Sequence, residues 1–232
     1  MAPALIVVSA AFSIASIVLW LRLRAARRAE YIRSFTLPHG LFERLQKHHP
    51  QLTLKDCQLV SKGLRQFFLA YLKGGRQYVS MPSQVADDLW HEFILYTRNY
   101  QQFCRKAFGG FLHHTPAVAL RSSKQGNAGL RRCWLHACRD ELINPTNPTR
   151  LPLLFALDAK LAIVGGFQYE ANCQGLKRQS VSGDSATPIY CAGDFSDTSI
   201  DGGIDGFDSF DSSDSSDGGG GDSSCGGGCG GD

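Results

Sequence analysis

The sequence lacks several motifs that would assign a biochemical class directly. No C-x-x-C pair occurs among its eight cysteines, so thioredoxin-like redox chemistry has no support. No G-x-x-x-x-G-K-S/T loop occurs, so no nucleotide partner is expected. No G-X-Y repeat runs through its 25 glycines, which excludes collagen. Alternation of apolar and polar residues is nearly absent from residues 31–178, which argues against a β-rich domain.

Basic residues are absent from the C-terminal part of the chain. All 24 Lys and Arg lie in residues 1–178 together with 10 of the 21 acidic residues, which leaves this part at +14. Residues 179–232 carry −11, and 12 of the 25 glycines lie in 202–231. An Asp/Ser/Gly segment cannot bury enough apolar surface to offset its ordering entropy. The sequence therefore predicts an acidic, glycine-rich, disordered tail over 179–232.

The N-terminus has an 18-residue run without charge, Ala4–Leu21. As a helix it would be about 27 Å long, close to the roughly 30 Å hydrocarbon core of a bilayer. A cleaved signal peptide would begin with a basic region, and no basic side chain precedes this run. We predict a membrane anchor and basic flank over 1–30, with the lipid bilayer as a partner.

Four arginines follow this run, whereas no charged side chain precedes it; they are Arg22, Arg24, Arg27 and Arg28. Positive residues stay on the cytoplasmic side of a membrane. We therefore predict a single-pass protein of the cell (inner) membrane, with its N-terminus out and its C-terminal domain cytoplasmic. The arginines could also bind anionic headgroups, or serve only as a stop-transfer signal.

The predicted topology decides how the cysteines are interpreted. Cytoplasmic thiols stay reduced, so disulfides are not expected. Four cysteines occupy helical apolar positions, where Cys is most often a small buried hydrophobe; they are Cys57, Cys104, Cys133 and Cys138. In the tail, Cys225 and Cys229 are too few for a closed zinc site, which needs four ligands.

Apolar residues recur every three or four positions through most of 31–178, the spacing of amphipathic helices. Thr53 offers a helix N-cap, with Asp56 three residues on. The expected helices run from Leu41 to before Pro50, from Thr53 to Gly74, from Ser83 to Gly109 with a possible break near Thr97, over 130–142, and from Pro152 to Val164. Residues 77–79 are the best strand candidate, and 121–126 are expected to form a polar loop. An all-α, helical-bundle-like domain over 31–178 follows.

The stretch 87–95 concentrates residues that can carry chemistry. Asp87 and His91 are four apart and share a helix face, and Asp88 lies three residues before His91. A carboxylate beside a histidine can orient the imidazole, raise its basicity or share a metal with it. The H-E-x-x-H zinc motif fails, because Leu95 stands where its second histidine is required.

Further candidate ligands lie downstream, beyond the expected break in this helix. A turn at Gly109-Gly110 could return one of two adjacent histidines to the first, giving a His/His/Asp or His/His/Cys set that suits zinc or another first-row metal. The candidate metal ligands are Asp87, His91, Cys104, His113 and His114. The alternative is that Trp90 and His91 only pack and hydrogen-bond between helices.

The same residues carry a resemblance to a known family. The motifs are Met81-Pro82-Ser83, Asp87–His91, Ile94-Leu95, Tyr100 with Cys104, Phe108-Gly109, Phe111–Pro116, Cys133-Trp134, Cys138, Glu141 and Leu151–Asp158, with the Gly/Cys tail. In these the chain resembles the bacterial glycine-rich domain-containing proteins, related to the helical domain of plant glycine-rich domain proteins. Plant members often have a second histidine where this chain has Phe93. The resemblance implies a helical domain and supplies no mechanism.

Taken together, these features predict a membrane-anchored interaction or scaffold protein with a protein partner. The alternative is a metal-dependent, hydrolase-like enzyme with a site around His91 and zinc or another divalent metal as cofactor. The +14 body could attract nucleic acid, but no reading motif accompanies the charge, so no nucleic-acid partner is expected.

Overall fold

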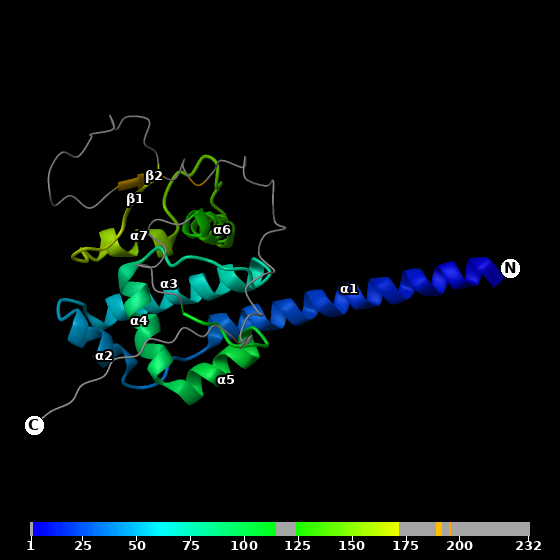
Figure 1. Cartoon of the computed structure of the whole chain (residues 1–232), viewed down its shortest axis with the longest axis horizontal. Coiled ribbons are helices and arrows are strands. Elements are labelled where there is room, and N and C mark those ends of the chain that lie inside the picture. Colours follow the sequence, from blue (N-terminus) through cyan, green and yellow to red (C-terminus); the bar gives the residue numbers. More distant parts are fainter. Residues whose placement is uncertain (1, 115–123, 172–188, 192–194, 196–232) are drawn as a thin grey trace, which may run out of the picture. The chain divides into compact units, whose positions relative to one another are not determined.

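The computed structural model describes residues 2–114, 124–171, 189–191 and 195. Its elements are α1 (Ala2–Ser34), α2 (Leu41–His48), α3 (Leu54–Lys73), α4 (Gln84–Leu95), α5 (Thr97–Ala107), α6 (Lys124–Asp140), α7 (Leu153–Lys160), β1 (Gln168–Glu170) and β2 (Ile189–Cys191). Figure 1 shows this order, with α3 lying among the other helices of the body. The predicted all-α class is confirmed for the described residues.

Helix α1 combines a membrane-type segment with a segment of the core. It is long and apolar enough to cross a membrane, and residues 9–27 are exposed. Its last turns are buried instead, with Ala29 and Ile32 in the core. The basic flank after the apolar run is therefore helical, because the helix continues without a break to Ser34.

Local signals set several helix ends as predicted. The Thr53 side chain accepts from the Asp56 N–H, and the Asp56 carboxylate accepts from the Thr53 N–H, which completes a capping box at α3. Gly74 follows the last residue of α3. The break expected near Thr97 is present, because Tyr96 separates α4 from α5.

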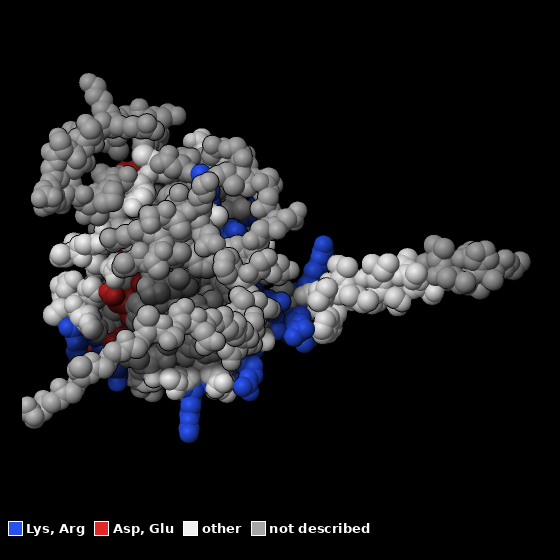
Figure 2. Space-filling model, viewed as in Figure 1, with Lys and Arg blue, Asp and Glu red and all other residues white. Residues whose placement is uncertain are grey.

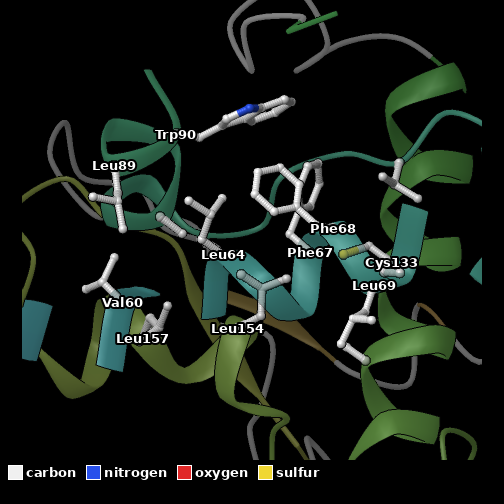
Figure 3. Close-up of a cluster of buried hydrophobic side chains, with 14 of the residues drawn as sticks. Val60, Leu64, Phe67, Phe68, Leu69, Leu89, Trp90, Cys133, Leu154 and Leu157 are labelled. Atoms are coloured by element: carbon white, nitrogen blue, oxygen red, sulfur yellow. The ribbon is translucent and has the colours of Figure 1, made fainter. Parts of the chain in front are cut away.

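Helix α3 supplies the centre of the hydrophobic core. Phe67 and Phe68 lie against Trp90 of α4, with ring centroids 5.0 and 6.0 Å apart (Figure 3). Phe68 also contacts Phe103 of α5 at 4.9 Å, and Leu154 of α7 is fully buried. Burial of each such side chain stabilises the fold by about 1.5–3 kcal/mol. The four helical cysteines are buried and free, as predicted.

A buried carboxylate joins α7 to the start of α4. Asp158 accepts hydrogen bonds from the Ser83 hydroxyl at 2.7 Å and the Gln84 N–H at 2.7 Å. It also accepts from the N–H groups of Val85 at 3.2 Å and Phe167 at 2.8 Å. A negative charge is favourable at a helix N-terminus, where backbone N–H groups lack helical partners. Asp158 therefore fixes the first turn of α4, which carries the candidate site.

Three sequence expectations about local structure are wrong. Residues 77–79 form no strand; instead β1 pairs with β2 in parallel, Tyr169 opposite Tyr190. Helix α6 already includes Lys124, so the polar loop expected over 121–126 does not reach its predicted end. Helix α7 ends at Lys160 rather than Val164, because Ala162 adopts a positive φ of 49°.

Part of the segment assigned to the tail contacts the helical body. Strand β2 lies beyond residue 178, and Phe195 contacts Trp134 at 5.7 Å and Tyr169 at 6.0 Å between ring centroids. Cys191 is disulfide-bonded, so the expectation that every thiol is reduced is wrong. The rest of the predicted disordered tail, including Cys225 and Cys229, lies outside the described residues.

Candidate metal centre

Helix α4 presents two of the predicted ligands on one face. Ser83 caps the helix by accepting from the Ala86 N–H at 3.2 Å. Asp87 lies in the first turn and is buried, while His91 lies one turn later with its side chain 49% exposed. The His91 Nδ1 atom is 3.7 Å from the Asp87 Oδ2 atom. The i, i+4 spacing therefore produces the predicted contact.

The third member, His114, reaches α4 from the segment that follows α5. The chain turns at Gly109, whose φ of +81° is favourable only for glycine among common residues. The Tyr100 hydroxyl then donates to the Leu112 carbonyl at 2.6 Å and accepts from the Trp90 indole N–H at 3.2 Å. Burial raises the pKa of Tyr100 well above its ordinary value, so the phenol keeps its donor proton.

Asp87, His91 and His114, hereafter the His-Asp cluster, converge on one point. The His114 Nε2 atom is 2.8 Å from Asp87 Oδ1, and the centroids of the two imidazoles are 4.1 Å apart. One ligand atom from each residue lies within 4.8 Å of those of the other two. Ligand atoms on a tetrahedral zinc lie about 3.4 Å apart, given bonds of roughly 2.0–2.1 Å. The Asp87–His114 separation of 2.8 Å is shorter than this and the Asp87–His91 separation of 3.7 Å is longer, so zinc would require small shifts of both pairs.

The members of the His-Asp cluster differ in how firmly they are held. The side chains of Asp87 and His114 are only 9% and 10% exposed. The His114 ring also packs on the Trp90 ring at 4.5 Å between centroids. Two ligands are therefore fixed by the core, whereas His91 faces solvent. Three protein ligands with one open side is the pattern of catalytic rather than structural zinc sites.

Two predicted ligands lie outside the His-Asp cluster. His113 is exposed and packs against Phe111 at 4.9 Å between ring centroids. Cys104 is fully buried in the core, and burial raises the pKa of its thiol. A thiol binds metal as the thiolate, so a raised pKa disfavours ligation. Of the adjacent histidines that the sequence left open, the structure brings His114 to Asp87.

Further histidine–carboxylate pairs on α4 were missed by sequence reasoning. His49 lies 2.8 Å from Asp88, and Glu92 accepts from His48 at 3.1 Å and Arg44 at 3.2 Å. The signal was the His48-His49 pair at the end of α2 together with acidic residues four apart on α4. Within the described residues these remain pairwise contacts, and the three-ligand group is the His-Asp cluster alone.

Comparison with known proteins assigns the chain to a family. A family profile described as UCP032817-like matches residues 27–195. The chain belongs to the UCP032817-like family. The matched range includes all three members of the His-Asp cluster and ends at Phe195, which packs on the helical body. No curated protein and no solved structure matches the chain. The name of the family states no activity.

Proposed function

We propose that the chain is a membrane-anchored protein whose helical domain binds a divalent metal ion through the His-Asp cluster. The observation that supports it is the convergence of one carboxylate and two imidazoles within 4.8 Å. Imidazole and carboxylate are ligands of zinc and of other first-row divalent metals. Zinc fits this set best, since it accepts three protein ligands and a fourth, exchangeable one.

The arrangement would leave the metal accessible from the side of His91. A zinc ion with an open position lowers the pKa of bound water to near 7 and can supply hydroxide. The predicted hydrolase-like activity would use this open position. The buried side of the site, formed by Trp90 and His114, would orient the ligands and exclude water from behind.

Metal analysis of the full-length chain in detergent tests the proposal. The protein is stripped with a chelator, reloaded with zinc, dialysed and measured by mass spectrometry. We expect one zinc per chain, retained in His113→Ala and lost in His114→Ala. His113 is the matched control, because it is adjacent in sequence but packs on Phe111.

Two results would contradict metal binding at the His-Asp cluster. Wild-type protein could take up no zinc while His114→Ala lowers its unfolding temperature, which would identify the cluster as packing only. Alternatively, both single variants could retain equal zinc, which would place the ion elsewhere.

We propose that α1 anchors the domain in the cell (inner) membrane, with the N-terminus outside and the body in the cytoplasm. The support is the group of arginines that follows the apolar run, since such residues stay inside. The disulfide at Cys191 argues for the opposite, oxidising side. A C-terminal reporter active only in the cytoplasm would support our orientation, and activity only outside would reverse it.

The interaction or scaffold role with a protein partner stays a second proposal. Its support is the near-complete exposure of two apolar side chains, Leu142 at 95% and Val164 at 94%, in the segments after α6 and α7. Crosslinking in cells should capture the same partner with wild-type protein and with His114→Ala. Loss of capture in Leu142→Ser with Val164→Ser, without loss of folding, would assign that partner to these segments.

A further inference from the structure

Basic side chains gather where α1 meets the helical body (Figure 2). They come from three segments that are distant in sequence: α1, the loop after α3, and α5. We call them the basic collar, which comprises Arg24, Arg27, Arg28, Arg76 and Lys106. All are exposed except Arg28, which is half-buried against the body.

Contacts with the body position three of the five collar residues. Arg28 lies directly against Gly109, where any side chain would collide with its guanidinium. Arg76 donates to the Phe108 carbonyl at 3.1 Å. Lys106 lies over the ring of Tyr31 at 5.7 Å. The collar is therefore built by tertiary packing and is more than a run of arginines after a span.

The α1 part of the collar concentrates positive charge with little compensation from acidic residues of the same helix. Arg24 and Arg76 are close enough to Arg28 to repel it electrostatically. Glu30 is the only acidic residue of α1, and it is exposed. Like charges held together by packing favour a polyanionic partner, since such a partner relieves their repulsion.

The position of the collar along α1 identifies that partner. Arg24 follows the end of the apolar run by three residues and Arg28 by seven, which is about 5 to 10 Å along a helix. Polar headgroups occupy roughly 5–8 Å on each side of the hydrocarbon core. Because α1 is one continuous helix packed into the body through Ile32, the body's collar residues are held close to this depth.

We propose that the basic collar binds the headgroups of anionic phospholipids and holds the C-terminal end of α5 against the membrane surface. The proposal rests on the membrane anchoring proposed above and is independent of metal binding. Arg76 and Lys106 lie far from the apolar run in the sequence, so hydropathy alone does not place them near the membrane. The proposal makes both of them lipid-contacting residues. The body would then be oriented relative to the bilayer instead of turning freely on its anchor.

Amine acylation of the full-length chain in lipid nanodiscs tests the proposal. Discs of phosphatidylcholine alone are compared with discs containing phosphatidylglycerol, and each lysine is quantified by mass spectrometry. We expect acylation of Lys106 to slow by about fivefold or more in the anionic discs and to recover in 1 M salt. Lys55 is the internal control, because it is exposed at the opposite end of α3 from Arg76.

Variants sharpen the result. Arg24→Gln combined with Arg27→Gln should remove most of the protection of Lys106, since both side chains are exposed and their loss removes two positive charges from the collar. Arg98→Gln, an exposed arginine at the start of α5, should leave protection unchanged.

Three outcomes would overturn the proposal. Equal acylation of Lys106 in both kinds of disc would remove anionic lipid as the ligand. Equal protection by inorganic phosphate in phosphatidylcholine discs would assign the collar to a free anion. A chain that does not enter discs at all would defeat the anchor as well, whereas insertion without protection would defeat the collar alone.

Discussion

Asp87 in the first turn of α4 and Asp158, which accepts hydrogen bonds from that turn, are both buried carboxylates, and their partners differ in kind. Asp158 accepts from three backbone N–H groups and one hydroxyl, all of them neutral donors. Asp87 is contacted by two imidazoles, one of them half-exposed. Backbone N–H groups cannot bind a metal ion, so the role of Asp158 is structural. A neutral imidazole has a lone pair, so the partners of Asp87 can turn to a shared cation.

The strongest way to break this comparison is to change the structural carboxylate. Asp158→Asn places an N–H where two of its four donors require an acceptor, whichever way the amide turns. Charged hydrogen bonds contribute about 1.5–3 kcal/mol each, so we expect a loss of about 3–5 kcal/mol in unfolding free energy. Thermal unfolding of the full chain in detergent, followed by circular dichroism, measures it.

Asp140→Asn is the control for that change. Asp140 accepts from Arg33 and Lys73 near the surface, and such pairs contribute about 0–1 kcal/mol. Equal losses in Asp140→Asn and Asp158→Asn would mean that the cap on α4 has no special importance.

The corresponding Asp→Asn change in the His-Asp cluster should lower metal affinity and leave stability nearly unchanged. Asp87→Asn keeps an acceptor for His114 but supplies a poor metal ligand. Loss of an outer-shell partner costs 10–100-fold in metal affinity, so loss of a direct ligand should cost about 100-fold or more. The free energy of unfolding of the metal-free protein should change by about 1 kcal/mol or less. Calorimetric zinc titration and thermal unfolding, run on the same preparation, separate the two effects.

His91→Ala should give a smaller change, because His91 is the exposed member of the cluster. We expect zinc affinity to fall about 100-fold, the lower end of the loss expected for a direct ligand, with helicity unchanged and stability within about 0.5 kcal/mol. His48→Ala is the matched control, since His48 is also exposed and also contacts an α4 carboxylate, Glu92. A similar loss of zinc in His48→Ala would shift the site toward α2.

The smallest effect concerns pH and a histidine outside the cluster. Burial, followed by the charges of Arg139, Lys73 and Arg132, lowers the pKa of His136. Its neutral form is then favoured in the folded chain, so protonation favours unfolding. Stability should decline as the pH falls below about 6.5, the ordinary pKa of the unfolded side chain.

His136→Gln should remove this part of the pH dependence. Thermal unfolding of both proteins between pH 8 and pH 5 measures the difference. If the two curves stay parallel over that range, His136 does not contribute to it.

Features that depend on residues close in sequence were predictable. The capping box of Thr53 and Asp56 forms within one helical turn, and the contact of Asp87 with His91 follows from i, i+4 geometry. The buried state of Cys133 and Cys138 follows from their place in the apolar stripe of one helix. In each case the determining interactions are local, or they follow from the helical periodicity of one segment.

Features that depend on packing between distant segments could not be predicted from the sequence. Residues 77–79 have strand-like composition but find no strand partner, whereas Gln168–Glu170 pairs with Ile189–Cys191. A short strand is stabilised by its neighbour, which composition does not identify. The structural role of Asp158 was not predicted, because three of its four donors lie more than 70 residues away in the sequence.

The sequence alone determined that this chain has one apolar N-terminal helix, a helical body and a carboxylate beside a histidine on one helix face, because charge distribution and helical periodicity dictate those features. Only the tertiary structure decided that His114, and not His113, lies beside Asp87 and His91. That choice depends on the turn at Gly109 and on the Tyr100 hydrogen bond to Leu112, which orient the segment after α5. Adjacent residues in an extended segment point to opposite sides, so identical side chains become distinguishable only when the chain is packed.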